Sequence, residues 1–493
     1  MSDNKGLSYE QKKAMYEQNI RDTDGIRHVD KLRDNTHTYS GSKKNNPSAR
    51  HRAERIQLTP PVRETVSEAA PAPEPVVRKK KIRKEESGSL QKFAAWWKNI
   101  PVAPAMEYVP NAKRGRFDTP LFTVVVILLV MGIIMMSSAS YAYALQEEGN
   151  SFAYAQKQLV AAIAGFVVML VLSRIDYRMW VHPFKLFKKK ENYNNGNGLN
   201  PAMIFFGFSI ILMVLVIFKG DAVADAKRWI TIAGIQIQPS ELLKIAAILL
   251  VAYLLQRNYE HRKERILGCL VYLCLMAVIC ALCMAQRHVS AMIIFCVLIY
   301  AMMIVGECNG KGLILLAILA VVGLLIMYYV VQWDYVTERV QGWLNPFSDS
   351  GDSTYQTSQS LITIGSGGWF GLGLGNSRQK YYYLPESQND FVFSIICEEL
   401  GFFGGMTVIL LFVLFEVRGF FIAARAKDKF GSLVAFGITL QIGLQAILNI
   451  AVACNAIPNT GISLPFFSYG RSALLTQLAE VGILLSISKD ANT

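Results

Sequence analysis

The sequence predicts an all-α polytopic membrane protein. Hydrophobic residues make up 52% of the 493 residues, the mean hydropathy is +0.28, and the apolar residues form blocks long enough to cross a bilayer. A membrane-spanning helix is expected in each of ten blocks, with ends good to a few residues: residues 119–142, 154–173, 200–218, 239–256, 266–285, 288–306, 312–332, 391–417, 431–453 and 462–488.

The basic residues of the connections predict the orientation of these helices. Lys and Arg resist translocation, whereas acidic residues matter little. The connections at 174–190, 257–265 and 418–429 are rich in Lys and Arg, so we place them and the N-terminus in the cytoplasm. An even number of helices returns the C-terminus to the cytoplasm. The long loop at 333–390, between helices seven and eight, is then extracytoplasmic, and the protein is a multi-pass membrane protein.

Residues 1–117 are predicted to be a largely disordered, basic cytoplasmic tail that precedes a membrane domain at 118–488. The tail holds 24 Lys or Arg and 14 Asp or Glu, and its apolar content is too low to offset chain entropy. A basic run at 78–84 and apolar or aromatic residues near 89–100 predict an interfacial helix beside anionic lipid. Nucleic-acid binding and a merely solvated basic face are the alternatives, and the aromatic residues favour lipid.

The first polar segment on the predicted outer side runs through residues 226–244. Pro239 suits the first turn of a helix, and Ser240 or Gln238 is able to cap it. Glu241 and Lys244 are three residues apart and share one helix face, so they are able to pair, which lowers the cost of both charges near hydrocarbon. The pair either locks two helices together or forms the charged wall of a cavity, and these interpretations are compatible.

The second polar segment is the long loop that ends at Asp390, where the next hydrophobic helix starts. Such long loops are unusual and often functional, and a merely structural loop is the alternative. Their glycines permit close approach to a ligand, while Arg378 and Lys380 are able to meet phosphate oxygens. An acid at the edge of the hydrocarbon is costly to desolvate, which makes Asp390 a functional candidate. Glu398 lies about 80° from Asp390 on a continuous helix, so it is expected to border the same cavity, whereas Glu399 is expected in a helix contact.

The third polar segment, residues 455–472, contains two prolines and two glycines that interrupt the last helical hairpin. Broken backbone at membrane depth is tolerated where it lines protein or a polar cavity. The segment therefore predicts a site between helices.

Four stretches in this order match a known family: QPSELLK at 238–244, YQ followed by GSGG and GLGNSRQK within 355–380, LPESQNDFVFSIICEELG at 384–401, and NTGISLPFFSYG at 459–470. Over roughly residues 115–488 the chain resembles the SEDS family of bacterial peptidoglycan glycosyltransferases, which includes FtsW, RodA and SpoVE. The run GLGNS, QK and LPE is more similar to the FtsW and SpoVE branch than to RodA.

The resemblance implies polymerisation of lipid II at the outer face of the cytoplasmic membrane, in septal cell-wall synthesis for cell division. A GlcNAc 4-hydroxyl attacks a MurNAc anomeric carbon, and undecaprenyl pyrophosphate leaves. Asp390 fits the general base, because a carboxylate with a pKa near ~4 is ionised at neutral pH. The residues expected to contact substrate are Arg228, Trp229, Gln238, Glu241, Lys244, Arg378, Lys380, Glu386, Glu398 and Ser468. Glu386 is the reserve carboxylate, and a solvated loop acid is its alternative interpretation.

The implied partners are lipid II, a class B penicillin-binding protein that acts as transpeptidase, and other division proteins. A divalent cation, Mg²⁺ or Mn²⁺, is implied by the family and by the pyrophosphate leaving group, whose charge Arg228, Arg378 and Lys380 would also stabilise. No metal-binding motif is recognisable in the sequence. A flippase or transporter of an anionic lipid, or a scaffold for division proteins, are the competing classes.

The chain departs from the family pattern at several places near these motifs. Arg471 stands where the family usually has a second glycine, Gln388-Asn389 replaces a common His-Thr, and Arg287-His288 replaces a frequent Pro-Asp. These departures bear on secondary ligand contacts rather than on the chemistry, since Asp390 itself is retained.

Overall fold

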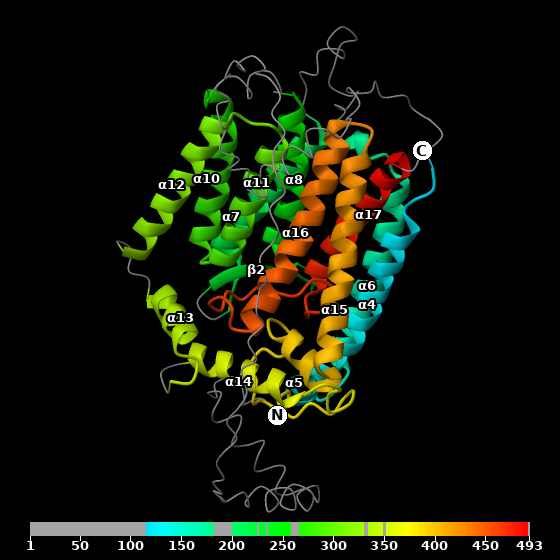
Figure 1. The fold of residues 1–493 in the computed structure, drawn as a ribbon, viewed down its shortest axis with the longest axis vertical. Coiled ribbons are helices and arrows are strands. Elements are labelled where there is room, and N and C mark those ends of the chain that lie inside the picture. Colours follow the sequence, from blue (N-terminus) through cyan, green and yellow to red (C-terminus); the bar gives the residue numbers. More distant parts are fainter. Residues whose placement is uncertain are drawn as a thin grey trace, which may run out of the picture. The chain divides into compact units, whose positions relative to one another are not determined.

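The computed structural model describes residues 115–181, 200–223, 226–232, 235–257, 266–329, 334–348 and 352–491. This part of the chain is mostly helical, as the sequence predicts (Figure 1). The basic tail up to residue 114, with the interfacial helix predicted near 89–100, lies outside the described residues.

Six helices are long and apolar enough to cross a membrane: α4 Thr119–Ala139, α6 Ala153–Arg174, α7 Pro201–Lys219, α8 Pro239–Arg257, α15 Val392–Arg425 and α16 Lys429–Ala453. Three further helices have shorter apolar segments: α10 Leu270–Ala285, α11 Val289–Val305 and α12 Gly310–Tyr329. The last helix, α17 Arg471–Ala491, has lower hydropathy and is largely buried. Each of the predicted spans overlaps one of these helices.

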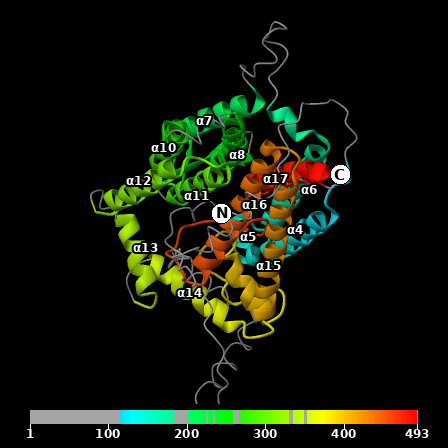
Figure 2. The same ribbon diagram turned by 45° about the horizontal axis from the view of Figure 1, so that its top comes forward.

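The helices pack around α8 and α16, which are the most enclosed of the six long apolar ones. In Figure 2, α7, α10, α11 and α12 lie on one side of this pair, and α4, α6, α15 and α17 lie on the other. Contacts of α7 with α8 and of α15 with α16 attach one group to each central helix, and α8 packs against α16. Polar side chains are buried between the central helices, among them Lys244 of α8 and Gln445 of α16.

The tenth predicted span was placed too early in the sequence. It was expected to begin at residue 462, but α17 begins at Arg471, and residues 454–470 contain no helix. Pro465 cannot donate to a helical ladder, and Gly461 has the positive φ of 66° that only glycine adopts without strain. The third polar segment is therefore an extended stretch within the helical domain.

The loops before the fourth and eighth predicted spans, and the segment after the first, carry secondary structure that the sequence analysis did not predict. A small antiparallel sheet precedes α8, with β1 Asp221–Val223, β2 Ala226–Ile232 and β3 Ile235–Ile237 in the order β1-β2-β3. Its register pairs Asp221 with Trp229 and Ile230 with Ile237. The long loop before α15 contains α13 Asp334–Leu344 and α14 Asp352–Ser366, and the short helix α5 Tyr141–Glu148 follows α4.

A kink at Gly401 connects α15 to the glycine-rich loop before it. Gly401 has φ 69° and ψ −169°, and a Cβ there would lie 2.3 Å from the Gly371 backbone nitrogen. The break frees carbonyl groups of the helix, and the loop supplies their donors: the N–H of Leu372 bonds the Glu398 carbonyl at 2.9 Å, and that of Gly373 bonds the Glu399 carbonyl at 3.0 Å. The loop that leads to Asp390 is thereby fixed to α15.

Candidate functional site

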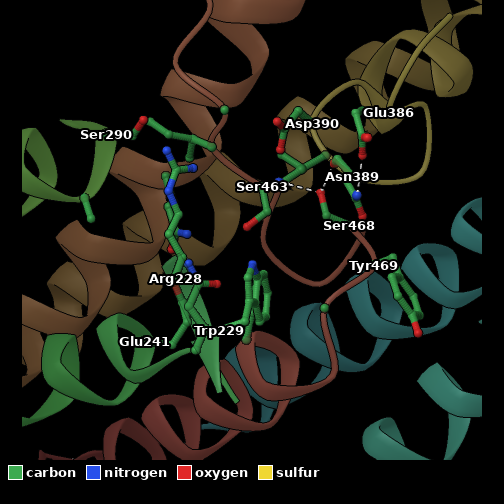
Figure 3. A pocket seen from close by; sticks show the side chains of 18 of the residues that line it. Arg228, Trp229, Glu241, Ser290, Glu386, Asn389, Asp390, Ser463, Ser468 and Tyr469 are labelled. Carbon is green, nitrogen blue, oxygen red and sulfur yellow. Dashed lines mark hydrogen bonds between the residues drawn. The ribbon is translucent and has the colours of Figure 1, made fainter. Parts of the chain in front are cut away.

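A cavity of about 820 Å³ lies where β2, the start of α8, the start of α11, the loop before α15 and the extended stretch before α17 meet (Figure 3). The structure brings together residues from all three polar segments of the sequence. The expected site residues that line this cavity are Arg228, Trp229, Gln238, Glu241, Lys244, Glu386, Asp390 and Ser468.

Asp390 lies two residues before α15 and is partly buried in the cavity wall. Asn449 of α16 fixes its backbone, because the Asn449 Nδ2 donates to the carbonyls of Asp390 and Ile462, both at 2.7 Å. A Cβ on Gly461 would lie 3.3 Å from the Asp390 Oδ2. The extended stretch therefore runs close beside the carboxylate, and Asn449 holds both segments.

Burial raises the pKa of Asp390 to about 6, and the negative charge of Glu386 adds to this effect. The positive charges of Arg339 and Arg228 oppose it. A pKa just below neutral leaves the carboxylate mostly ionised at neutral pH, and it makes this group a stronger base than an ordinary aspartate.

The Ser468 hydroxyl joins the extended stretch to the loop before Asp390. Its Oγ donates to the Asn389 carbonyl at 2.5 Å and accepts from the Leu464 N–H at 2.7 Å. The Tyr469 N–H bonds the Gln388 carbonyl at 2.8 Å. Ser468 thus lines the cavity, but its hydroxyl holds two backbone segments together, as Figure 3 shows.

Positive side chains form another part of the wall. Arg228 projects from β2, and its Nη2 donates to the Arg287 carbonyl at 2.6 Å. Lys244 pairs with Glu241 at 2.8 Å and donates to the Gln445 Oε1 of α16 at 3.2 Å. Both interpretations of the Glu241 and Lys244 pair therefore hold, since it lines the cavity and also joins α8 to α16.

Three residues that were expected to contact substrate lie outside this cavity. The Glu398 carboxylate accepts from the Ser377 hydroxyl and from the Arg378 N–H, the latter at 3.1 Å. Lys380 is 2% exposed and pairs with Glu399 at 3.0 Å. Arg378 is exposed on the loop surface. The expectation that Glu398 borders the cavity of Asp390 was wrong, because Glu398 binds the glycine-rich loop instead.

Other residues line the cavity without having been proposed as site residues: Glu147, Tyr154, Arg287, His288, Arg339, Gln388, Asn389, Tyr469 and Arg471. Five of these residues are the positions where the sequence departs from the family pattern, Arg287-His288, Gln388-Asn389 and Arg471, and those departures could have indicated them. Tyr154 and Tyr469 stack with ring centroids 4.8 Å apart. Asn449 was missed too, although a polar side chain inside an apolar helix is itself a functional signal.

We expect Asn449→Ala to lower the turnover number for substrate by roughly tenfold to a hundredfold with a smaller change in KM, because a misplacement of about 1 Å in a catalytic group has an effect of that size. Steady-state kinetics of the purified variant measure the split. Asn455→Ala is the matched control, since Asn455 follows the same helix but bonds the Trp343 carbonyl away from Asp390. Equal turnover in both variants would contradict a positioning role for Asn449.

The cavity does not fit a metal centre built from protein ligands alone. Within the described residues, no group of three or more His, Cys, Asp or Glu side chains is close enough to hold a metal ion. Four acids line the cavity, Glu147, Glu241, Glu386 and Asp390, and the Glu386 carboxylate already accepts a hydrogen bond from the Asn389 Nδ2 at 2.6 Å.

These observations define a helical integral membrane protein whose polar cavity is lined by a partly buried carboxylate, Asp390, just before an apolar helix. The chain belongs to the FtsW/RodA/SpoVE family: the model of this family, described as cell cycle protein, matches residues 119–493. The prediction of the SEDS family from four ordered motifs is thereby confirmed.

This chain aligns with nearly the whole length of two curated relatives. The chain is 34% identical over 373 residues to a Geobacter sp. (strain M18) protein named "Probable peptidoglycan glycosyltransferase FtsW", which covers 76% of this chain and 96% of that one. It is 34% identical over 379 residues to stage V sporulation protein E of Bacillus subtilis (strain 168), which covers 77% of this chain and 99% of that one. Both relatives belong to the FtsW and SpoVE branch, as the motifs predict.

Solved structures share the fold. A chain from a structure of a peptidoglycan synthase complex superposes with a TM-score of 0.60 and 24% identity, over 76% of this chain and 98% of that one. Rod shape determining protein RodA of Thermus thermophilus gives a TM-score of 0.54 and 22% identity, over 76% and 98%. The helical arrangement is therefore that of a RodA-like fold.

Proposed function

We propose that the chain is a peptidoglycan glycosyltransferase that polymerises lipid II in cell division, with Asp390 as its general base. The observation that carries this proposal is the cavity: the matched motifs of a glycosyltransferase family meet around one partly buried carboxylate of raised pKa. The names of the two curated relatives, a glycosyltransferase and a sporulation protein of the same family, support it.

In the proposed reaction, the 4-hydroxyl of an acceptor GlcNAc lies beside Asp390. Its oxygen forms a bond to the MurNAc anomeric carbon of the donor as the bond from that carbon to the pyrophosphate oxygen breaks. The hydroxyl proton passes to the Asp390 carboxylate and later to water, and undecaprenyl pyrophosphate leaves with the bonding electrons. Arg228 and Arg339 line the same cavity, so they are placed to stabilise the negative charge that develops on the leaving group.

The proposed topology has ten membrane-spanning helices, both termini in the cytoplasm, and the cavity on the outer side. Basic residues in three of the predicted cytoplasmic connections support this orientation. The long loop with α13 and α14, which ends at Asp390, would then face the periplasmic or extracellular side, where lipid II is polymerised.

A divalent cation, Mg²⁺ or Mn²⁺, remains part of the proposal as an ion that accompanies the pyrophosphate. Mg²⁺ commonly takes only one or two protein carboxylates and fills its shell with substrate phosphates and water. Since the described residues do not form a metal site by themselves, none of the steps above depends on this ion.

The proposed partner is a class B penicillin-binding protein, which would cross-link the strands that this chain polymerises, together with other division proteins. The fold neighbour from a peptidoglycan synthase complex supports such a partner, because polymerization and crosslinking are coordinated in that complex.

The test of the proposed function is polymerisation of purified lipid II by the full chain and a candidate class B partner in detergent. Glycan strands should form, because a glycosyltransferase needs no membrane with two sides. A flippase or transporter would leave lipid II unpolymerised under these conditions. A division scaffold would also form no strands, and it would depend on residues 1–110 rather than on Asp390.

We expect the rate of polymerisation to rise with pH through a midpoint near 6 and to level off above about pH 7. The pKa of Asp390 is raised to about 6, and only the ionised carboxylate accepts the proton, so activity is lost as the pH falls through that value. Below the midpoint the rate should fall about tenfold per pH unit. Initial rates between pH 5 and 8 measure this limb, and a flat profile over that range would contradict the base assignment.

A further inference from the structure

His288 is fixed in the turn between α10 and α11, immediately before the first residue of α11. Its backbone N–H bonds the Cys283 carbonyl at 2.8 Å, and its own carbonyl accepts from the Met292 N–H at 3.2 Å. The side chain is only 8% exposed, yet it lines the cavity that contains Asp390. The imidazole is therefore held at the cavity wall by a rigid turn.

Two buried nitrogens of this wall have no hydrogen-bond partner among the described residues: Nδ1 of His288 and Nε of Arg228. Buried polar atoms in native proteins are almost always hydrogen-bonded. Both residues line the same cavity, so a ligand that accepts a hydrogen bond from the Arg228 Nε and, in the tautomer with the proton on Nδ1, from His288 would satisfy both nitrogens.

The charges around His288 favour an anionic ligand. Arg228 and Arg287 are joined by a hydrogen bond beside it, and Lys244 is the third cation, partly balanced by Glu241. Burial, and after it the positive charges of Arg228 and Lys244, lower the pKa of His288 to about 3. The imidazole is therefore neutral, and it offers an N–H donor without adding a charge that would repel Arg228.

We propose that His288 and Arg228 together bind an oxygen of the diphosphate of the polyprenyl-linked substrate. This inference rests on the proposed function and adds a binding residue to it. A neutral imidazole donates a hydrogen bond to a phosphate oxygen, whereas an acid in its place would pair with Arg228 and repel that oxygen.

Binding of a diphosphate should change the protonation of His288. The negative charge of the ligand offsets Arg228 and Lys244, the two cations that disfavour imidazolium, so the pKa of His288 rises in the complex. The other charged groups that line the cavity are Glu147, Glu241, Arg287, Arg339, Glu386, Asp390 and Arg471.

The test compares His288→Leu with His288→Asn in the full chain. Leucine has a similar size and no donor, whereas the asparagine amide places an N–H near the position of Nδ1. The probe is undecaprenyl diphosphate titrated into detergent-solubilised protein, with undecaprenol as the phosphate-free control. We expect His288→Leu to weaken diphosphate binding roughly tenfold to a hundredfold, His288→Asn to retain most of the affinity, and undecaprenol binding to be unchanged.

A second measurement is the NMR titration of labelled histidine, with the His288 signal identified by its loss in His288→Asn. A raised imidazole pKa at saturating undecaprenyl diphosphate supports the proposal. Wild-type diphosphate affinity in His288→Leu, or an unchanged imidazole pKa, overturns it. If the wild type polymerises lipid II but His288→Leu binds diphosphate as tightly as the wild type, only the binding role of His288 and Arg228 is refuted. If the wild type binds diphosphate through His288 but makes no strands, only the proposed function is refuted.

Discussion

Asp390→Asn is expected to lower the rate of lipid II polymerisation roughly 10²- to 10⁴-fold, the usual contribution of a positioned general base. The amide has nearly the same shape as the carboxylate but does not accept the acceptor hydroxyl's proton. The Asn449 bond to the residue 390 carbonyl involves the backbone only, so it persists in the variant. The variant should therefore fold, insert in the membrane and bind lipid II. Strand formation per enzyme, followed by gel separation of labelled glycan, measures the effect.

Glu386→Gln is the matched control for this variant. Glu386 lines the same cavity and raises the pKa of Asp390 through its charge, but its carboxylate is exposed and bonded to the Asn389 amide. We expect a modest loss of rate and a pH midpoint moved slightly lower, because one nearby negative charge is removed. If Glu386→Gln abolished polymerisation while Asp390→Asn retained it, the general base would be Glu386 and not Asp390.

Lys380→Met is expected to destabilise the folded protein by about 3–5 kcal/mol, the usual effect of removing one partner from a buried ion pair. Glu399 is fully buried, and without Lys380 its charge loses its only salt-bridge partner among the described residues. The Gly375 and Ser377 N–H groups and the Ser138 hydroxyl still donate to it, but they do not neutralise it. Thermal unfolding in detergent measures the loss.

Lys157→Met provides the comparison for Lys380. Lys157 pairs with Glu148 at 2.5 Å, but the two side chains are 42% and 33% exposed, so solvent screens the pair and its loss should change stability by less than about 1 kcal/mol. Adding Glu399→Gln to Lys380→Met should restore part of the stability, because the unpaired buried charge is then gone. Equal unfolding temperatures for the Lys380 and Lys157 variants would contradict the structural role given to the Lys380 pair.

The helices were predictable from the sequence because each predicted span is an apolar block, and apolar blocks of that length have few alternatives. Arg228, Asp390 and Ser468 were predictable as candidate site residues, because membrane packing alone does not select polar residues at such positions. They lie more than 70 residues apart along the chain, so spacing alone does not predict that they line one cavity. The family resemblance implied a common site, and the fold places them in it.

The error at Glu398 shows where helical geometry failed as a guide. The expected angle between Asp390 and Glu398 assumed one continuous helix from residue 390, but α15 begins at Val392 and Asp390 lies in the preceding turn. At the kink at Gly401, the glycine-rich loop packs against α15, and Glu398 and Glu399 accept hydrogen bonds from this loop. A positive φ at a single glycine inside an apolar helix leaves no periodic signal in the sequence.

The strands before α8 were missed for a different reason. β1 and β3 contain three residues each, too few for an alternating pattern to stand out. They nevertheless matter to the site, because β2 carries Arg228 and Trp229 into the cavity.

The most direct test of the central claim measures lipid II occupancy and glycan strand formation on the same samples of wild-type chain and Asp390→Asn, each with the class B partner. We predict equal occupancy of the two proteins by lipid II, with strands made only by the wild type. Strand formation by Asp390→Asn at a rate near that of the wild type, at equal occupancy, would contradict the assignment of Asp390 as the base.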